Sequence, residues 1–194
     1  VLCCDPPRAR YGEVTHDGRP FVGLDELSAQ SDIITFHVPL SRAGEDATLH
    51  MADSDFFGTL RGNAVVINSS RGEVIDTAAL NNFLRAGRGS AIIDTWENEP
   101  VIDLQLLDAT MLATPHIAGY SAQGKANATA MSVQAVAREF GLPLTEWYPS
   151  GEVPRIDPQN ITWQELLPTI FGYFDIASQS AALKASPRDF EQMR

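Results

Sequence analysis

Residues 91–120, AIIDTWENEPVIDLQLLDATMLATPHIAGY, decide the expected fold of the chain. The stretch opens with an apolar run that ends at Asp94, bends through an acidic segment, and reaches a second apolar run at residues 110–113. Short apolar runs that end in polar residues predict strands of a sheet. If the two strands are parallel neighbours, Glu99 and His116 follow them at the same edge and can meet across the crevice there.

A histidine beside a carboxylate is suited to proton transfer. The carboxylate fixes the tautomer of the ring and makes it bind its proton more tightly, which suits a general acid or base near neutral pH. By spacing alone, Glu99 and His116 are better explained as ordinary loop residues, because short polar patterns recur by chance. The rest of the chain therefore decides between the two interpretations.

Two apolar runs upstream predict further strands of the same sheet. Residues 32–39, DIITFHVP, are stopped by their final proline, and residues 64–68, AVVIN, are β-branched and apolar, as in a strand covered on both faces. Residues 48–51 lead into a predicted helix that ends near residue 60, and a second helix is predicted at residues 77–86. Strands that alternate with helices predict an α/β fold with a doubly wound parallel sheet, which binds ligands at the carboxyl ends of its strands.

The first residues predict a strand that is already inside a domain. Residues 1–4 are apolar, and two prolines after Asp5 end the run. Cys3 and Cys4 point to opposite faces of such a strand, so they are interpreted as core residues rather than as a disulfide or a metal site. Because the chain starts without a methionine in mid-domain sequence, it is expected to be a fragment.

The C-terminal part is predicted to be one long helix followed by a separate tail. An alanine-rich helix is predicted at residues 121–140, and the proline-rich residues 144–158 mark a boundary. An amphipathic segment at 163–182 leads to a charged end. This tail is too short to hold a core of its own, so it is expected to pack on a partner subunit or to be cut short.

The composition and net charge of the chain limit the kinds of molecule that it is expected to bind. The 194 residues carry a formal net charge of -11, with 44% hydrophobic and 20% charged residues, as in an ordinary globular protein. The acidic balance argues against nucleic acid or an anionic membrane surface, although a local basic pocket for a phosphate or carboxylate remains compatible with it. No apolar run approaches the roughly 20 residues of a membrane span, so a cytoplasmic location is expected.

The turn after residues 64–68 adds a cation to the same sheet edge. Arg71 can bind a carboxylate through two parallel hydrogen bonds and can stabilise an oxygen that gains negative charge. Alone, it is better explained as a surface ion pair with Glu73 or Asp76. Together with Glu99 and His116 it supplies an anion clamp, a base and the residue that orients the base.

That trio fits the oxidation of a 2-hydroxy acid. His116 takes the hydroxyl proton as a hydride leaves the same carbon, Glu99 stabilises the imidazolium, and Arg71 holds the carboxylate. A hydride acceptor is then required. The residues placed to hold its adenosine and nicotinamide are Asp5, Thr35, the Ser69 and Ser70 backbone, Asp94 and Gly119.

Three segments resemble the signature segments of the D-2-hydroxyacid dehydrogenases: NSSRGEVID at 68–76, IIDTWENEP at 92–100 and TPHIAGY at 114–120. By this resemblance Arg71, Glu99 and His116 are the catalytic residues. NAD is the cofactor, contacted by the residues named above and by Arg71, and Tyr120 and Arg71 contact the substrate. Trp96 and Trp163 are interpreted as core or interface residues, and His16, His37 and His50 as structural or exposed.

Within that family, CDPPR at 4–8, DIITFHVPL at 32–40 and HIAGYSAQGKA at 116–126 resemble the branch that acts on a phosphorylated four-carbon 2-hydroxy acid. Residues 172–194 resemble its C-terminal dimerisation region, cut short, which implies a homodimer. The resemblance implies a partial NAD-binding domain at 1–120, a long helix at 121–145 that returns toward a substrate domain, and a partial dimerisation region at 146–194.

The chain departs from the family pattern in two ways. It contains neither the substrate-domain segment nor the glycine-rich G-x-G-x-x-G turn that holds the cofactor pyrophosphate at a helix N-terminus. The isolated chain is therefore expected to be inactive. Three alternatives remain open: a phosphoglycerate or hydroxypyruvate dehydrogenase of the same family, an NAD-sensing binding protein, and a piece that serves only for dimerisation.

Overall fold

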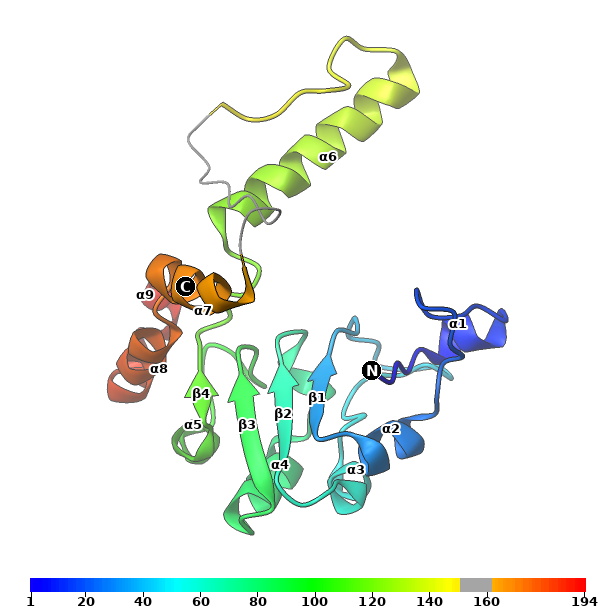
Figure 1. Ribbon diagram of the computed structural model, residues 1–194. Coiled ribbons are helices and arrows are strands. Elements are labelled where there is room, and N and C mark those ends of the chain that lie inside the picture. Colours follow the sequence, from blue (N-terminus) through cyan, green and yellow to red (C-terminus); the bar gives the residue numbers. More distant parts are fainter. Residues whose placement is uncertain (151–161) are drawn as a thin grey trace. The chain divides into compact units, whose positions relative to one another are not determined.

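The computed structural model describes residues 1–150 and 162–194, and these form two compact units (Figure 1). The first unit contains Val1–Pro115 and Ala177–Met193, and the second contains His116–Ile176 and Arg194. Among the described residues, no helix combines the length and the apolar character needed to cross a membrane.

The first unit is built on a four-stranded sheet in which all neighbours are parallel. The strands lie side by side in the order β1, β2, β3 and β4 (Figure 1). This arrangement confirms the predicted parallel α/β fold. The strand bounds are Ile33–Phe36 for β1, Ala64–Asn68 for β2, Gly89–Ile93 for β3 and Leu112–Ala113 for β4.

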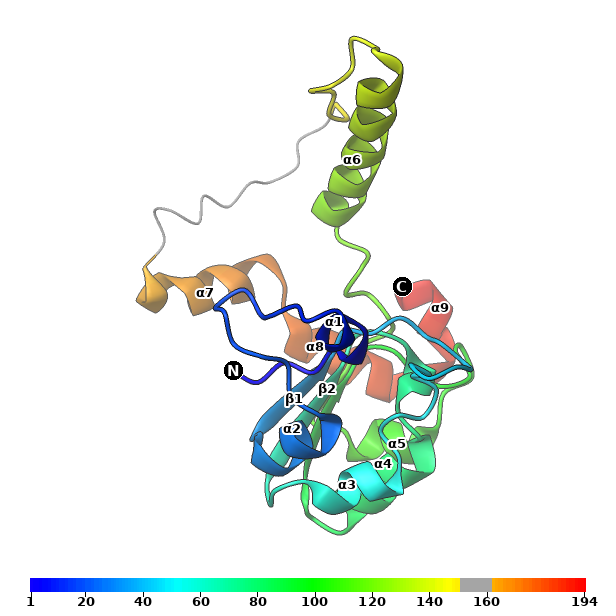
Figure 2. The same cartoon turned by 90° about the vertical axis from the view of Figure 1, so that its right-hand side faces the viewer.

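Helix α2, which precedes β1, and the helices between the strands form a row in which α2 contacts α3, α3 contacts α4, and α4 contacts α5. Figure 2 shows α3, α4 and α5 along one face of the sheet. Three of the four begin at an aspartate whose carboxylate accepts backbone N–H groups of the first turn: Asp53, Asp76 and Asp103. The helix bounds are Leu24–Gln30 for α2, Ser54–Thr59 for α3, Thr77–Arg85 for α4 and Leu104–Ala109 for α5.

The helix-covered face of the sheet forms the core. Along β2 the residues alternate between buried and half-buried, and none is exposed. On β1 the outward residue Ile33 is 64% exposed, whereas Ile34 and Phe36 are buried. The Phe36 ring packs at a tilt against that of Phe56, and ring contacts continue through Phe57 to Phe83, which joins the sheet to the helices.

The N-terminal residues do not form the predicted strand. Residues 1–4 have no strand pairing, and a short helix, α1 (Pro6–Arg10), follows them. Asp5 caps this helix by accepting the Arg8 N–H at 3.1 Å, and proline is well tolerated in a first helical turn. Pro6 and Pro7, which were expected to end a strand, thus start a helix. Both cysteines are free and half-buried rather than core residues.

The second unit contains the long helix predicted at residues 121–140. Helix α6 (Ala122–Phe140) begins at Ser121, whose hydroxyl accepts the Gly124 N–H at 2.9 Å, and ends at Gly141 in the left-handed region. The predicted boundary at 144–158 lies partly outside the described residues. Helix α7 (Trp163–Tyr173) follows, and Trp163 on it is 84% exposed, so it is not a core residue.

The end of the chain returns to the first unit. Helices α8 (Ile176–Ala185), η2 (Pro187–Asp189) and α9 (Phe190–Met193) complete the chain. Leu183 and Phe190 are buried in the same core as the sheet, with exposures of 0% and 1%. This part of the predicted tail is therefore packed on the chain's own sheet.

Two hydrogen bonds hold helix α8 against the last strand. Ser180 Oγ accepts the Ala113 N–H at 2.9 Å, and Lys184 Nζ donates to the Thr110 carbonyl at 2.6 Å. Both bonds satisfy backbone groups at or next to β4, an edge strand of the sheet.

Candidate active site

The turn after β2 is shaped by a buried asparagine. Asn68 Oδ1 accepts from the Ser70 N–H at 3.1 Å and from the Ser70 hydroxyl at 2.8 Å, and its Nδ2 donates to the Arg71 carbonyl at 2.9 Å. These bonds fix the backbone of Ser69, Ser70 and Arg71 at the carboxyl end of the strand. The Arg71 side chain is left to project outward.

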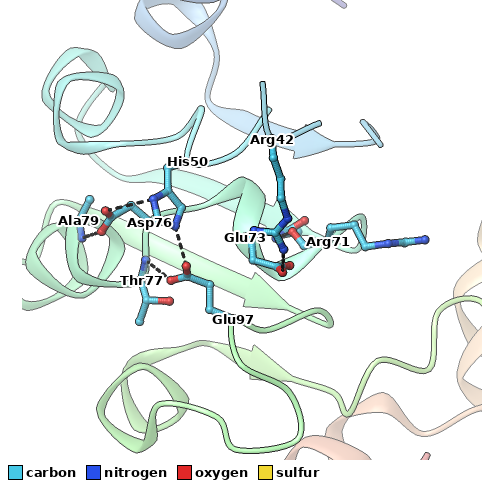
Figure 3. Close-up of polar contacts among 9 residues, drawn as sticks. Arg42, His50, Arg71, Glu73, Asp76, Thr77, Ala79 and Glu97 are labelled. Atoms are coloured by element: carbon cyan, nitrogen blue, oxygen red, sulfur yellow. Dashed lines mark hydrogen bonds and ion pairs between the residues drawn. The ribbon is translucent and has the colours of Figure 1, made fainter. Parts of the chain in front are cut away.

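Arg71 is not the surface ion pair that the sequence alone favoured. Its Nη1 donates to the Ser70 carbonyl at 2.7 Å, and no carboxylate within residues 1–150 and 162–194 pairs with it. Glu73 pairs with Arg42 at 2.9 Å, and Asp76 caps helix α4 through the Ala79 N–H at 2.8 Å. Figure 3 shows the Arg71 side chain extending away from these groups.

The loop after β3 carries the predicted base-orienting carboxylate. Asp94 is buried, and its Oδ1 accepts the Thr114 hydroxyl at 2.6 Å, which ties the end of β3 to the end of β4. Glu99 is half-buried, and its Oε1 accepts the Trp96 N–H at 2.8 Å. Trp96 is buried, as predicted, and its indole Nε1–H donates to the Thr114 carbonyl at 2.9 Å.

The arginine turn and the glutamate loop are in direct backbone contact. A methyl group added at Gly72 would lie closer than 3.0 Å to the Trp96 carbonyl group and to the Glu97 amide nitrogen. Only glycine permits this approach. The structure therefore brings the segments that carry Arg71 and Glu99 together at one edge of the sheet.

The same loop is also held by Glu97, which contacts His50 and the start of helix α4 (Figure 3). His50 Nε2 lies 2.6 Å from Glu97 Oε1, and Glu97 Oε2 accepts the N–H of Thr77 at 3.1 Å, at the start of helix α4. Burial by itself raises the pKa of the Glu97 carboxyl, but the hydrogen bonds from Thr77 and His50 outweigh it, so the pKa lies below its ordinary value.

Residues predicted on the last segment belong to the second unit. His116 is half-buried and adopts the left-handed backbone conformation, with φ of 55°. Because Glu99 lies in the first unit, the pairing of Glu99 with His116 stays a prediction. Gly119 is exposed, and the Tyr120 ring faces two cations, with Lys125 Nζ 4.3 Å and Arg194 Cζ 4.7 Å from its centroid.

Two residues predicted to contact the cofactor, Thr35 and Asp5, belong to the first unit. Thr35 is exposed on β1, and its hydroxyl lies 3.0 Å from His37 Nε2. Asp5 uses one carboxylate oxygen to cap α1, and its other oxygen makes no hydrogen bond within the described part of the chain. Thr35 lies within β1, the Ser69 turn follows β2 and Asp94 follows β3, so these three groups come from neighbouring strands of one unit.

Sequence reasoning missed two features of this site. The His50 and Glu97 pair joins residues 47 positions apart, and no local pattern signals such a contact. Trp96 was expected to be buried, but the partner of its indole N–H was not. A polar atom on a buried aromatic usually finds an acceptor, and that rule is the signal that was available.

The sequence is similar to those of known proteins along its whole length. Residues 1–118 match the family described as D-isomer specific 2-hydroxyacid dehydrogenase, NAD binding domain. An erythronate-4-phosphate dehydrogenase of Bacteroides fragilis is 44% identical over 195 residues, which cover 100% of this chain and 54% of that protein. One of Bacteroides thetaiotaomicron is 42% identical over 198 residues, with the same coverage of 100% and 54%. The chain spans about half the length of the curated relatives it matches.

Solved structures of the same fold are also similar. D-lactate dehydrogenase from Aquifex aeolicus, complexed with NAD and lactic acid, matches with a TM-score of 0.58 and 26% identity over 79% of this chain and 50% of that one. The holo form of D-mandelate dehydrogenase from Rhodotorula graminis matches with a TM-score of 0.57 and 27% identity, over 73% and 42% of the two chains.

Proposed function

The chain belongs to the D-isomer specific 2-hydroxyacid dehydrogenase family, and from that premise we propose that it is part of an NAD-dependent erythronate-4-phosphate dehydrogenase. The proposed reaction oxidises the 2-hydroxyl of 4-phospho-D-erythronate to the 2-oxo acid, a step in the synthesis of pyridoxal 5′-phosphate. The choice of substrate is supported by relatives of that name that align with the whole chain at 42% and 44% identity.

The observation that carries the proposal is the contact between the arginine turn and the glutamate loop. Gly72 lets the two backbones touch, so a guanidinium and a half-buried carboxylate follow neighbouring strands at one sheet edge. A 2-hydroxy acid needs a cation for its carboxylate and a paired base for its hydroxyl. Groups that follow the strands of a parallel sheet lie at the edge where ligands of this fold bind, which supports the proposal.

Each residue of the proposed trio has a distinct role. Arg71 binds the substrate carboxylate through two N–H groups and draws electron density toward the carbonyl oxygen that forms. His116 takes the proton of the 2-hydroxyl, and Glu99 stabilises the imidazolium that results. NAD, when bound, accepts the hydride that leaves C2. Tyr120 is proposed to contact the rest of the substrate.

The residues around this edge fit a dinucleotide. The second carboxylate oxygen of Asp5 suits the ribose hydroxyls, and its negative charge would repel the 2′-phosphate of NADP, which favours NAD. Thr35, the Ser69 and Ser70 backbone, Asp94 and Gly119 are proposed to line the rest of the cofactor. Because Asp94 and Ser70 are both buried and hydrogen-bonded, that part of the wall is already ordered.

The remaining parts of the proposal concern the whole protein. The 194 residues contain no G-x-G-x-x-G turn and span about half the length of the relatives. We therefore propose that the isolated chain does not turn over substrate. We propose a cytoplasmic homodimer in which residues 146–194 contribute to the interface. Sedimentation of the full-length protein would show the dimer.

The test is an assay of the full-length protein that carries this chain. NADH formation from NAD and 4-phosphoerythronate is compared with formation from 3-phosphoglycerate, and hydroxypyruvate reduction is followed with NADH. We expect a clear preference for 4-phosphoerythronate. The His116→Ala variant should lose about 10²- to 10⁴-fold in kcat, the range for removal of a general base, while its Kd for NAD stays close to that of the wild type.

Two results would contradict the proposal. Equal losses in turnover and in NAD affinity would remove His116 from proton transfer. NAD binding without turnover of any of the three substrates would favour a non-catalytic NAD-binding protein. The control is His16→Ala, because His16 is exposed and outside the proposed trio.

A further inference from the structure

We propose that Trp96 is the positioning residue that holds the three segments of the proposed trio in register. The inference rests on the proposed function, because it assigns Trp96 a role in that reaction. Trp96 is 3% exposed and follows β3, the strand between β2 and β4. A residue just after β3 can therefore contact the segments that follow β2 and β4.

The indole ring ties the loop to the segment that leads to His116. Its Nε1–H donates to the Thr114 carbonyl at 2.9 Å, two residues before the histidine. The Thr114 hydroxyl in turn donates to Asp94 Oδ1 at 2.6 Å. Thr114 and the next residue, Pro115, are both buried, so the segment that precedes His116 is anchored in the first unit.

The backbone of Trp96 contacts the other two segments. Its N–H donates to Glu99 Oε1 at 2.8 Å, which restricts the carboxylate proposed to face the histidine. Its carbonyl group packs against Gly72, the residue after Arg71, at a separation that leaves no room for a methyl group. One residue thus touches the segments of Arg71 and Glu99 and the approach to His116.

The side chain must be tryptophan for the first of these contacts. A phenylalanine would fill much of the same buried space but has no donor for the Thr114 carbonyl. A buried carbonyl that loses its donor is unfavourable, so the end of β4 would shift to find another partner. Shifts of about 1 Å in a catalytic group can lower turnover by about 10²-fold.

The experiment compares Trp96→Phe with Ser180→Ala in the full-length protein. Ser180 is the matched control, because its hydroxyl also satisfies a buried backbone group of β4, the Ala113 N–H, but does not touch the proposed trio. We expect both variants to lower Tm. Only Trp96→Phe should lower kcat, by about 10- to 100-fold, with little change in KM for NAD.

Two readouts separate positioning from stability. In Trp96→Phe the pH profile of kcat should shift, because the histidine and its carboxylate lose their alignment, and the primary deuterium isotope effect with substrate labelled at C2 should rise. In Ser180→Ala both should match the wild type. If Trp96→Phe does not fold, benzothienylalanine at position 96 keeps the bicyclic shape and replaces only the N–H by sulfur.

The outcomes are distinguishable. A Trp96→Phe or benzothienylalanine protein with wild-type kcat and pH profile overturns the inference and leaves the proposed function standing. Equal losses of kcat in the Trp96 variant and in Ser180→Ala also overturn it, since both would then follow from stability. A wild-type protein that turns over none of the 2-hydroxy acids overturns the proposed function and this inference with it.

Discussion

Replacement of Gly72 by alanine should strongly destabilise the chain. The new Cβ would lie closer than 3.0 Å to the Trp96 carbonyl carbon and oxygen and to the Glu97 nitrogen. These are backbone atoms in a buried turn, so no side chain can rotate away. Overpacking usually costs about 1 to 3 kcal/mol, and because the neighbouring atoms here are rigid we expect a cost of about 3 kcal/mol.

That cost can be measured directly. About 3 kcal/mol corresponds to about a 150-fold change in the unfolding equilibrium. For a chain of this length it lowers Tm by about 6 to 12 °C. Urea unfolding followed by far-UV circular dichroism gives the free energy, and a thermal scan gives Tm. The free energy of unfolding, rather than activity, is the quantity predicted.

Gly58 provides the matched control. It lies inside helix α3, and a methyl group added there meets nothing within 4 Å. Because glycine in a helix is less favourable than alanine, Gly58→Ala should raise stability by about 0.5 to 1 kcal/mol. A Gly72→Ala chain that unfolds at the wild-type urea concentration would refute the close packing of the two segments.

Two further predictions concern charged residues. Glu97 has a lowered pKa in the folded chain, so its contribution to stability is present above the ordinary value of 4.5 and is lost as pH falls through the folded pKa. Stability of the wild type should therefore fall more steeply below pH 4.5 than that of Glu97→Gln, and parallel curves would refute this. In the full-length protein, Arg71→Lys should raise KM for the 2-hydroxy acid and lower kcat, because an ammonium lacks the two-pronged contact; near-normal turnover would make Arg71 structural.

The sheet was predictable because its strands carry their own signal. The runs at 64–68 and 91–93 contain consecutive β-branched or apolar residues, and polar residues lie at or just after the carboxyl end of each. Asp76 and Gly87 marked the limits of helix α4 for local reasons, a carboxylate cap and a left-handed turn. Local rules such as these need no knowledge of what packs against the element.

The predictions that were wrong, and the contacts that were missed, depend on residues distant in sequence. Residues 1–4 have strand-like composition, but a strand needs a neighbour to bond with, and composition does not supply one. Burial of Leu183 and Phe190 against the sheet could not be read from a tail that looked too short for a core of its own. The same limit applies to the contact between His50 and Glu97, which depends on a loop brought back from a different strand.

Arg71 is available to a ligand because the acids around it are already engaged. Acidic side chains outnumber basic ones by 25 to 14 in this chain, so an arginine without a carboxylate is not the default. The nearby acids all have other partners, since Glu73 pairs with Arg42, Asp76 caps helix α4, and Glu97 binds His50 and the start of α4. With these carboxylates occupied, the strongest remaining partner for the guanidinium is an anion from solution. The local charge pattern therefore supports the proposed role of Arg71 in binding the substrate carboxylate, even though the surface as a whole would repel an anion.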